Sequence, residues 1–80
     1  MRRRRSDPVY TAAKERAAAA RVAVQRVDPQ YGWLADRVWA ETLLATERVP
    51  ASAAVTMFTR IAIMLEVLAD WRGWLAGRMR

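Results

Sequence analysis

Four consecutive arginines at positions 2–5 are the residues whose type and spacing best suit a chemical task. The planar guanidinium group presents several N–H donors in a fixed fork, which matches the oxygen atoms of a phosphate group. Lys14 and Arg21 follow at a spacing of seven residues, which places them on one side of a helix. The residues that we predict to bind the phosphates of DNA or RNA are Arg2, Arg3, Arg4, Arg5, Lys14 and Arg21.

The distribution of charge along the chain supports this prediction. Residues 1–27 contain eight basic and two acidic side chains, whereas residues 28–80 contain six of each, so the whole net charge of +6 lies in the first third. Such an asymmetry indicates a polyanion at the basic end and protein contacts elsewhere. Thirteen arginines against one lysine, with sixteen alanines, are typical of a GC-rich genome, and we expect a bacterial or phage-encoded protein.

Residues for enzyme chemistry are scarce. The chain has neither histidine nor cysteine, so the commonest general base and the thiolate metal ligands are missing. Ser6 and Ser52 are better explained as turn or cap residues than as nucleophiles. Asp36 and Glu41 are five residues apart and point in different directions on a helix. We therefore expect no enzyme activity, no metal site and no cofactor.

The elements that must position these residues are predicted to be helices. The sequence Asp-Pro-x-Tyr occurs at residues 7–10 and again at 28–31, and in each copy the aspartate can cap a helix whose first residue is proline. Pro50 interrupts the chain once more, and Ser52 offers a third cap. We predict an all-α three-helix bundle with helices at roughly 8–27, 29–48 and 51–76. Residues 1–6 form a basic N-terminal arm, and residues 7–80 form a single domain.

Apolar spacing predicts which sides of the helices are buried. The first helix carries a seam of mostly alanine at spacings of three and four, comprising Tyr10, Ala13, Ala17, Ala20, Val24 and Val27. The third helix carries a broad apolar face, comprising Met57, Phe58, Ile61, Met64, Leu65, Leu68, Trp71 and Leu75. Trp39 and Leu65 are expected to be well buried.

Two helices carry a second apolar stripe that a three-helix monomer would leave exposed. In the second helix this stripe contains Trp33, Ala40 and Leu44. The third helix is also predicted to be longer than its neighbours, so we expect its Trp-bearing end to overhang. Tryptophan is enriched among the residues that dominate protein interfaces. The residues predicted to form an oligomer or partner interface are Trp33, Leu44, Ile63, Val67, Trp71 and Trp74. The alternative is that the tryptophans fill the base of an ordinary core.

Membrane insertion and secretion are not expected. Ser6, Asp7 and Pro8 follow the arginines where a signal peptide would have its apolar region. The most apolar tract, residues 51–71, is interrupted by Arg60, Glu66 and Asp70. A basic helix at residues 8–27 lying on anionic lipid is a further alternative, although its alanine face would insert weakly. We predict a cytoplasmic protein.

Two functions from different classes follow from these patterns. The leading hypothesis is a non-enzymatic accessory protein that binds nucleic-acid phosphates through its basic N-terminal third, from a bacterium or a mobile element. Such contacts position a protein without reading base sequence. The alternative is a helical interaction module, such as an inhibitor, adaptor or small subunit, that docks through its Trp-rich surface.

Overall fold

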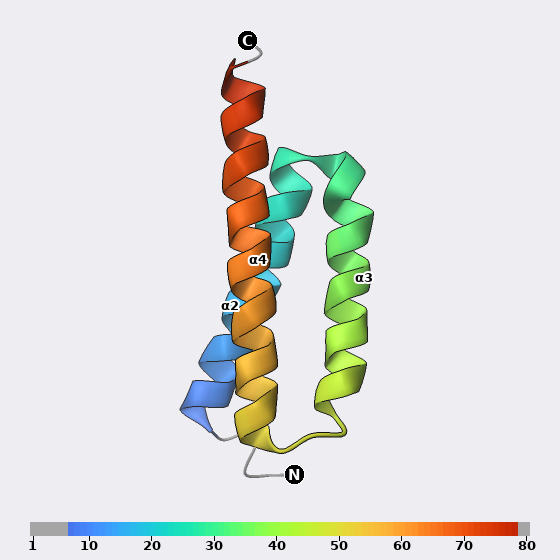
Figure 1. Ribbon diagram of the computed structural model, residues 1–80, viewed down its shortest axis with the longest axis vertical. Coiled ribbons are helices and arrows are strands. Elements are labelled where there is room, and N and C mark those ends of the chain that lie inside the picture. The colour runs from blue at the N-terminus through green and yellow to red at the C-terminus, as the bar shows by residue number, and fades with distance from the viewer. Residues whose placement is uncertain (1–6, 79–80) are drawn as a thin grey trace.

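Three α-helices make up the part of the chain that the computed structural model describes, residues 7–78, and no strand occurs there. They are α2 (Pro8–Val27), α3 (Pro29–Thr46) and α4 (Ala51–Arg78), which run up, down and up in Figure 1. The prediction of an all-α protein with three helices is confirmed. The predicted N-terminal arm, with its arginines at positions 2–5, lies outside the described residues.

The two aspartates of the repeated motif cap their helices as predicted. The carboxylate of Asp7 accepts a hydrogen bond of 2.9 Å from the backbone N–H of Val9. The carboxylate of Asp28 accepts one of 3.0 Å from the backbone N–H of Gln30. These bonds satisfy N–H groups that have no partner in a first helical turn. Asp28 is also the only residue between α2 and α3, so one side chain fixes the turn between two helices.

The remaining helix ends differ slightly from the prediction. α3 ends at Thr46, two residues before the predicted end, and the backbone N–H of Arg48 closes a turn onto the carbonyl of Ala45. α4 begins at Ala51, so Ser52 lies inside its first turn and is not the N-cap. The carbonyl of Pro50 accepts the backbone N–H of Ala54 instead. α4 continues to Arg78, past the predicted end at residue 76.

The three helices do not pack equally against one another. α2 shares its largest interface with α4 and a smaller one with α3, whereas α3 and α4 touch little. In Figure 1, α2 passes behind α4 while α3 stands to one side. The C-terminal end of α4 rises beyond the connection between α2 and α3, which is the predicted overhang. A Cβ atom at Gly73 would lie 3.7 Å from Val27, so α4 passes the end of α2 at this position.

The core forms where α2 meets its neighbours. The α2 seam is buried as predicted, except for Val27, which is 38% exposed at the last position of the helix. Phe58 on α4 is fully buried at the centre of one cluster, with its ring centroid 5.8 Å from the rings of both Tyr10 and Trp39. Leu65 is 2% exposed, as predicted, and packs with Val24 in a second cluster.

The buried side of α4 overlaps the predicted apolar face only in part, because Phe58 and Leu65 are buried but the other buried residues are alanines. Met64, which lies on the predicted apolar face, is 51% exposed, and Trp71 is 50% exposed, as its predicted place at an interface requires. The residues that α4 buries are Ala54, Phe58, Ala62, Leu65 and Ala69. Alanines on α4 thus face the alanines of α2, and small side chains on both helices allow a short distance between their axes. Close approach of the two backbones therefore determines which side of α4 is buried.

Trp39 packs against the core but is only partly buried, so it is less buried than the prediction of a well-buried residue. α3 packs on α2 through small residues, among them Gly32 and Ala35, and has little contact with α4. The Trp39 indole packs against Phe58 and also borders a cleft between α2 and α3.

Candidate functional site

All six residues that we predicted at a partner interface are exposed. Their exposed fractions range from 48% for Ile63 to 64% for Trp33. No described part of the chain covers them, and the alternative in which the tryptophans fill the base of the core applies to none of Trp33, Trp71 and Trp74. The six residues are divided between two helices. Trp33 and Leu44 lie on α3, and the other four lie on α4.

The α3 surface consists of Trp33 and Leu44. They lie on the side of α3 opposite its buried residues Ala35 and Thr42, because their positions differ by about half a turn at 100° per residue. Trp33 and Leu44 are eleven residues apart, with Arg37 and Ala40 between them on this side. The apolar area on α3 is therefore sparse.

The α4 surface is denser, and we call it the outer face of α4. It lies opposite the buried side of the helix and consists of Arg60, Ile63, Met64, Val67, Asp70, Trp71 and Trp74, all of them exposed. Within residues 7–78, neither Arg60 nor Asp70 forms an ion pair or a hydrogen bond through its side chain. At the end of the helix, the guanidinium group of Arg78 lies 4.9 Å from the centre of the Trp74 ring. This face offers several large apolar side chains and two unpaired charges of opposite sign.

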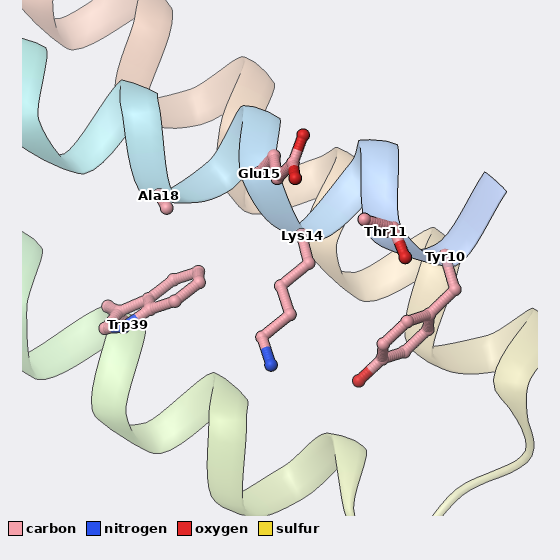
Figure 2. A pocket seen from close by; sticks show the side chains of 6 residues that line it. All are labelled: Tyr10, Thr11, Lys14, Glu15, Ala18 and Trp39. Atoms are coloured by element: carbon pink, nitrogen blue, oxygen red, sulfur yellow. The ribbon is translucent and has the colours of Figure 1, made fainter. Parts of the chain in front are cut away.

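A second candidate site is a cleft of about 310 Å³ between α2 and α3, lined by Tyr10, Thr11, Lys14, Glu15, Ala18 and Trp39. Figure 2 shows the Lys14 side chain extending from α2 into the space between the rings of Tyr10 and Trp39. The Glu15 carboxylate points the other way. Lys14 forms no ion pair within residues 7–78. An ammonium group between aromatic walls suits a small anionic group that carries an apolar part.

Arg21, the other predicted phosphate ligand on α2, is engaged inside the molecule. Its guanidinium group lies 5.4 Å from the centre of the Trp39 ring, and its Nε atom is 3.6 Å from the carboxylate of Asp36. That carboxylate accepts a hydrogen bond of 2.6 Å from the side chain of Gln25. The Nε atom of Arg21 is buried without a hydrogen-bond partner. Lys14 and Arg21 thus both point toward α3, and the assignment of phosphate contacts to them stays a prediction.

Arg16 and Glu66 form an ion pair that spacing along the chain did not indicate. Two guanidinium nitrogens of Arg16 donate hydrogen bonds of 2.8 Å to the two carboxylate oxygens of Glu66, joining α2 to α4. The hydrogen bond from Arg16 lowers the pKa of Glu66 below its ordinary value, and the same contact raises the pKa of Arg16. Both side chains remain about half exposed, so solvent screens their attraction.

Arg72 is a second basic residue whose role the sequence did not reveal. It approaches Asp28 to 2.6 Å, and the carboxylate is largely buried. The guanidinium group also lies 5.1 Å from the centre of the Tyr31 ring and 5.2 Å from that of Trp71. Three contacts with different elements hold Arg72 between the α2–α3 junction and the outer face of α4.

Two further properties bear on the kind of site. In the described part of the chain, no three aspartate or glutamate side chains gather closely enough to hold a metal ion. By length and composition alone, α4 is apolar enough to cross a membrane, and 22% of its apolar stretch is buried in this structure. The expectation that the protein does not enter membranes stays a prediction.

The fold and these surfaces define a small all-α protein of three helices with an exposed apolar face on α4 and a lysine-bearing cleft between α2 and α3. Comparison of the chain with protein-family models, with curated proteins and with solved structures finds no match.

Proposed function

We propose that this protein is a helical interaction module that assembles with another protein chain through the outer face of α4. The observation that supports this most is the exposure of five large apolar side chains on one helix side. Their exposed fractions are Ile63 48%, Met64 51%, Val67 62%, Trp71 50% and Trp74 57%. Monomeric soluble proteins rarely leave a continuous apolar patch of this kind uncovered.

The magnitude of the burial indicates what the partner must provide. Full burial of one large apolar side chain contributes about 1.5–3 kcal/mol, so five side chains that are half exposed offer roughly 4–7 kcal/mol. Association costs about 4–15 kcal/mol in lost freedom of movement. One such face is marginal against this cost, and the partner must bring a comparable apolar face of its own.

The test is the size of the purified protein in solution. We expect light scattering at micromolar concentrations to report a species larger than the 9.1 kDa chain. Trp74→Ala should weaken assembly, whereas Trp33→Ala on α3 removes an equally exposed indole elsewhere and should leave it unchanged. A protein that stays at the mass of one chain over the whole concentration range would refute the proposal.

Binding of nucleic-acid phosphates is a second candidate function, supported by the placement of the entire net charge of +6 in residues 1–27. If the arginines at positions 2–5 neutralise four phosphates, log affinity for duplex DNA should fall with log salt at a slope of about −3.6. Changing all four to alanine should remove most of this slope and weaken every sequence equally. Absence of any DNA or RNA binding at low salt would exclude this function.

A further inference from the structure

We infer that the partner on the outer face of α4 is a second copy of this chain, whose own α4 lies antiparallel to the first and crosses it at position 65. The inference rests on the proposed function and adds to it the identity of the partner, its direction and its register. Four features of α4 support it: residue spacing, symmetry of residue type, charge and helix length.

The first feature is the spacing of the residues along the outer face. Six exposed residues follow one another at intervals of four, three, four, three and four, which is the spacing that keeps side chains in register along a pair of helices. They are Thr56, Arg60, Ile63, Val67, Asp70 and Trp74. We call this set the outer seam. It lies opposite the buried residues of α4, so α2 and α3 leave it open.

The second feature is the symmetry of the outer seam about position 65. When two copies of α4 meet antiparallel at this position, residues at equal distances before and after it face each other. Ile63 of one copy then meets Val67 of the other, and both are apolar and β-branched. An antiparallel pair of this kind has twofold symmetry, so every contact occurs twice.

The third feature is charge. Arg60 and Asp70 lie five residues before and five residues after position 65, so each meets its opposite charge in the second copy. Both side chains are exposed and have no ion-pair partner within residues 7–78. In a parallel pair at the same level, Arg60 would face Arg60 and Asp70 would face Asp70. Complementary charges across the contact therefore favour the antiparallel direction and exclude the parallel one.

The fourth feature is length. α4 runs from Ala51 to Arg78, so its midpoint lies between positions 64 and 65, almost at the centre of the symmetric seam. Two antiparallel copies in this register overlap along the entire helix. The overhang of α4 beyond the α2–α3 junction then packs against the first turns of the second copy, where Trp74 covers Thr56. A line of larger side chains, Met57, Met64 and Trp71, runs beside the seam and widens the contact.

The same charges argue against a lipid surface as the partner of the outer face of α4. Arg60 and Asp70 both lie within the outer seam, about 15 Å apart along the helix at 1.5 Å per residue. A bilayer would have to take up both ionised groups together with the apolar residues between them, which is costly without a partner for each charge. A second α4 supplies a partner for both.

The experiment exchanges the two charges and measures dimer dissociation by sedimentation. Arg60→Asp places two carboxylates opposite each other, and Asp70→Arg places two guanidinium groups opposite each other, so each single variant should weaken the dimer about tenfold or more. The double variant R60D/D70R restores opposite charges and should return the dissociation constant to within a few-fold of the original. Arg48→Asp is the matched control, because it makes the same charge change at an exposed site off the seam.

Each other outcome overturns the inference. Assembly that Trp74→Ala weakens but that the single charge variants leave intact would keep the proposed function and reject this register. A double variant no tighter than the single variants would show that positions 60 and 70 do not face each other. Binding of the unmodified protein to vesicles of anionic phospholipid, with loss of the dimer, would identify lipid as the occupant. A chain that never assembles would reject the inference and the proposed function together.

Discussion

The guanidinium group of Arg72 lies 2.6 Å from the carboxylate of Asp28, which ties α4 to the one-residue junction between α2 and α3. Asp28 forms hydrogen bonds with all three helices. Its backbone N–H bonds to the carbonyl of Val24 in the last turn of α2, and its Oδ1 atom accepts the N–H of Gln30 in the first turn of α3. Its Oδ2 atom accepts the hydrogen bond from Arg72. One carboxylate therefore fixes where the three helices meet.

The two copies of the Asp-Pro-x-Tyr motif allow the ion pair to be separated from capping. Serine caps helices about as well as aspartate, so Asp7→Ser should change the free energy of unfolding by less than about 0.5 kcal/mol. Asp28→Ser keeps the cap but leaves Arg72 partly buried without its carboxylate, and should cost about 1–3 kcal/mol. Urea denaturation measures both. Equal effects of the two substitutions would show that the Arg72 contact contributes nothing.

The Arg16–Glu66 ion pair predicts a dependence of stability on pH. Because the pKa of Glu66 is lowered in the folded protein, the ionised form is favoured by folding, and the stabilisation is fully present above the ordinary glutamate pKa. It is lost as the pH falls through the lowered pKa of the folded state. The original protein should therefore have a higher melting temperature than the Glu66→Gln variant at pH 7, and the two melting temperatures should converge in acid. A constant difference down to low pH would contradict this prediction.

Substitution by alanine should distinguish the central aromatic residue of the core, Phe58, from the peripheral one, Trp39. Phe58 is fully buried between Tyr10 and Trp39, so Phe58→Ala should cost about 3–5 kcal/mol through lost burial and a cavity. Trp39 is only partly buried, and Trp39→Ala should cost clearly less. For a domain of this size, the first loss approaches the whole free energy of unfolding. Similar urea midpoints for the two variants would contradict the packing described here.

The alanine contact between α2 and α4 should tolerate little enlargement. Ala17 has no exposed surface, so Ala17→Leu must push the helices apart and should cost about 1–3 kcal/mol. Ala19, on the exposed side of the same helix, is the matched control, and Ala19→Leu should be nearly neutral. Thermal melts of the two variants test this comparison. If both variants have the same melting temperature as the original protein, the two helices are not in close contact.

Local signals were sufficient to predict the helices. Asp7 and Asp28 are each followed by proline, and each Asp-Pro pair marks the start of a helix. Pro50 marks the third start. The alanine seam of α2 was also evident, because spacings of three and four define one side of a helix whatever the size of its residues. These features depend only on neighbours within one or two turns.

Features that depend on distant residues were not predicted. Arg16 and Glu66 are 50 positions apart and Arg72 and Asp28 are 44 apart, so no spacing along a single helix indicates that they meet. The predicted apolar face of α4 matches its buried side only in part, because apolar patterns weight large side chains, whereas Ala62 is buried through close contact with α2. The candidate site shows the same limit. Exposure of Trp74 could be inferred from surplus apolar residues, but exposure of Met64 on the same face of α4 required the fold.

The alanine interface between α2 and α4 has a consequence for conformational entropy. Alanine has no side-chain rotamers to lose on burial, whereas methionine loses up to about 2 kcal/mol of rotamer freedom. Folding of this chain thus orders mainly side chains such as Ala17 and Ala62, for which ordering costs nothing beyond the backbone. Met64, exposed on the outer face of α4, keeps its rotamers in the folded monomer. In the assembly that we propose, the entropic cost of ordering the large outer residues therefore arises on association and not on folding.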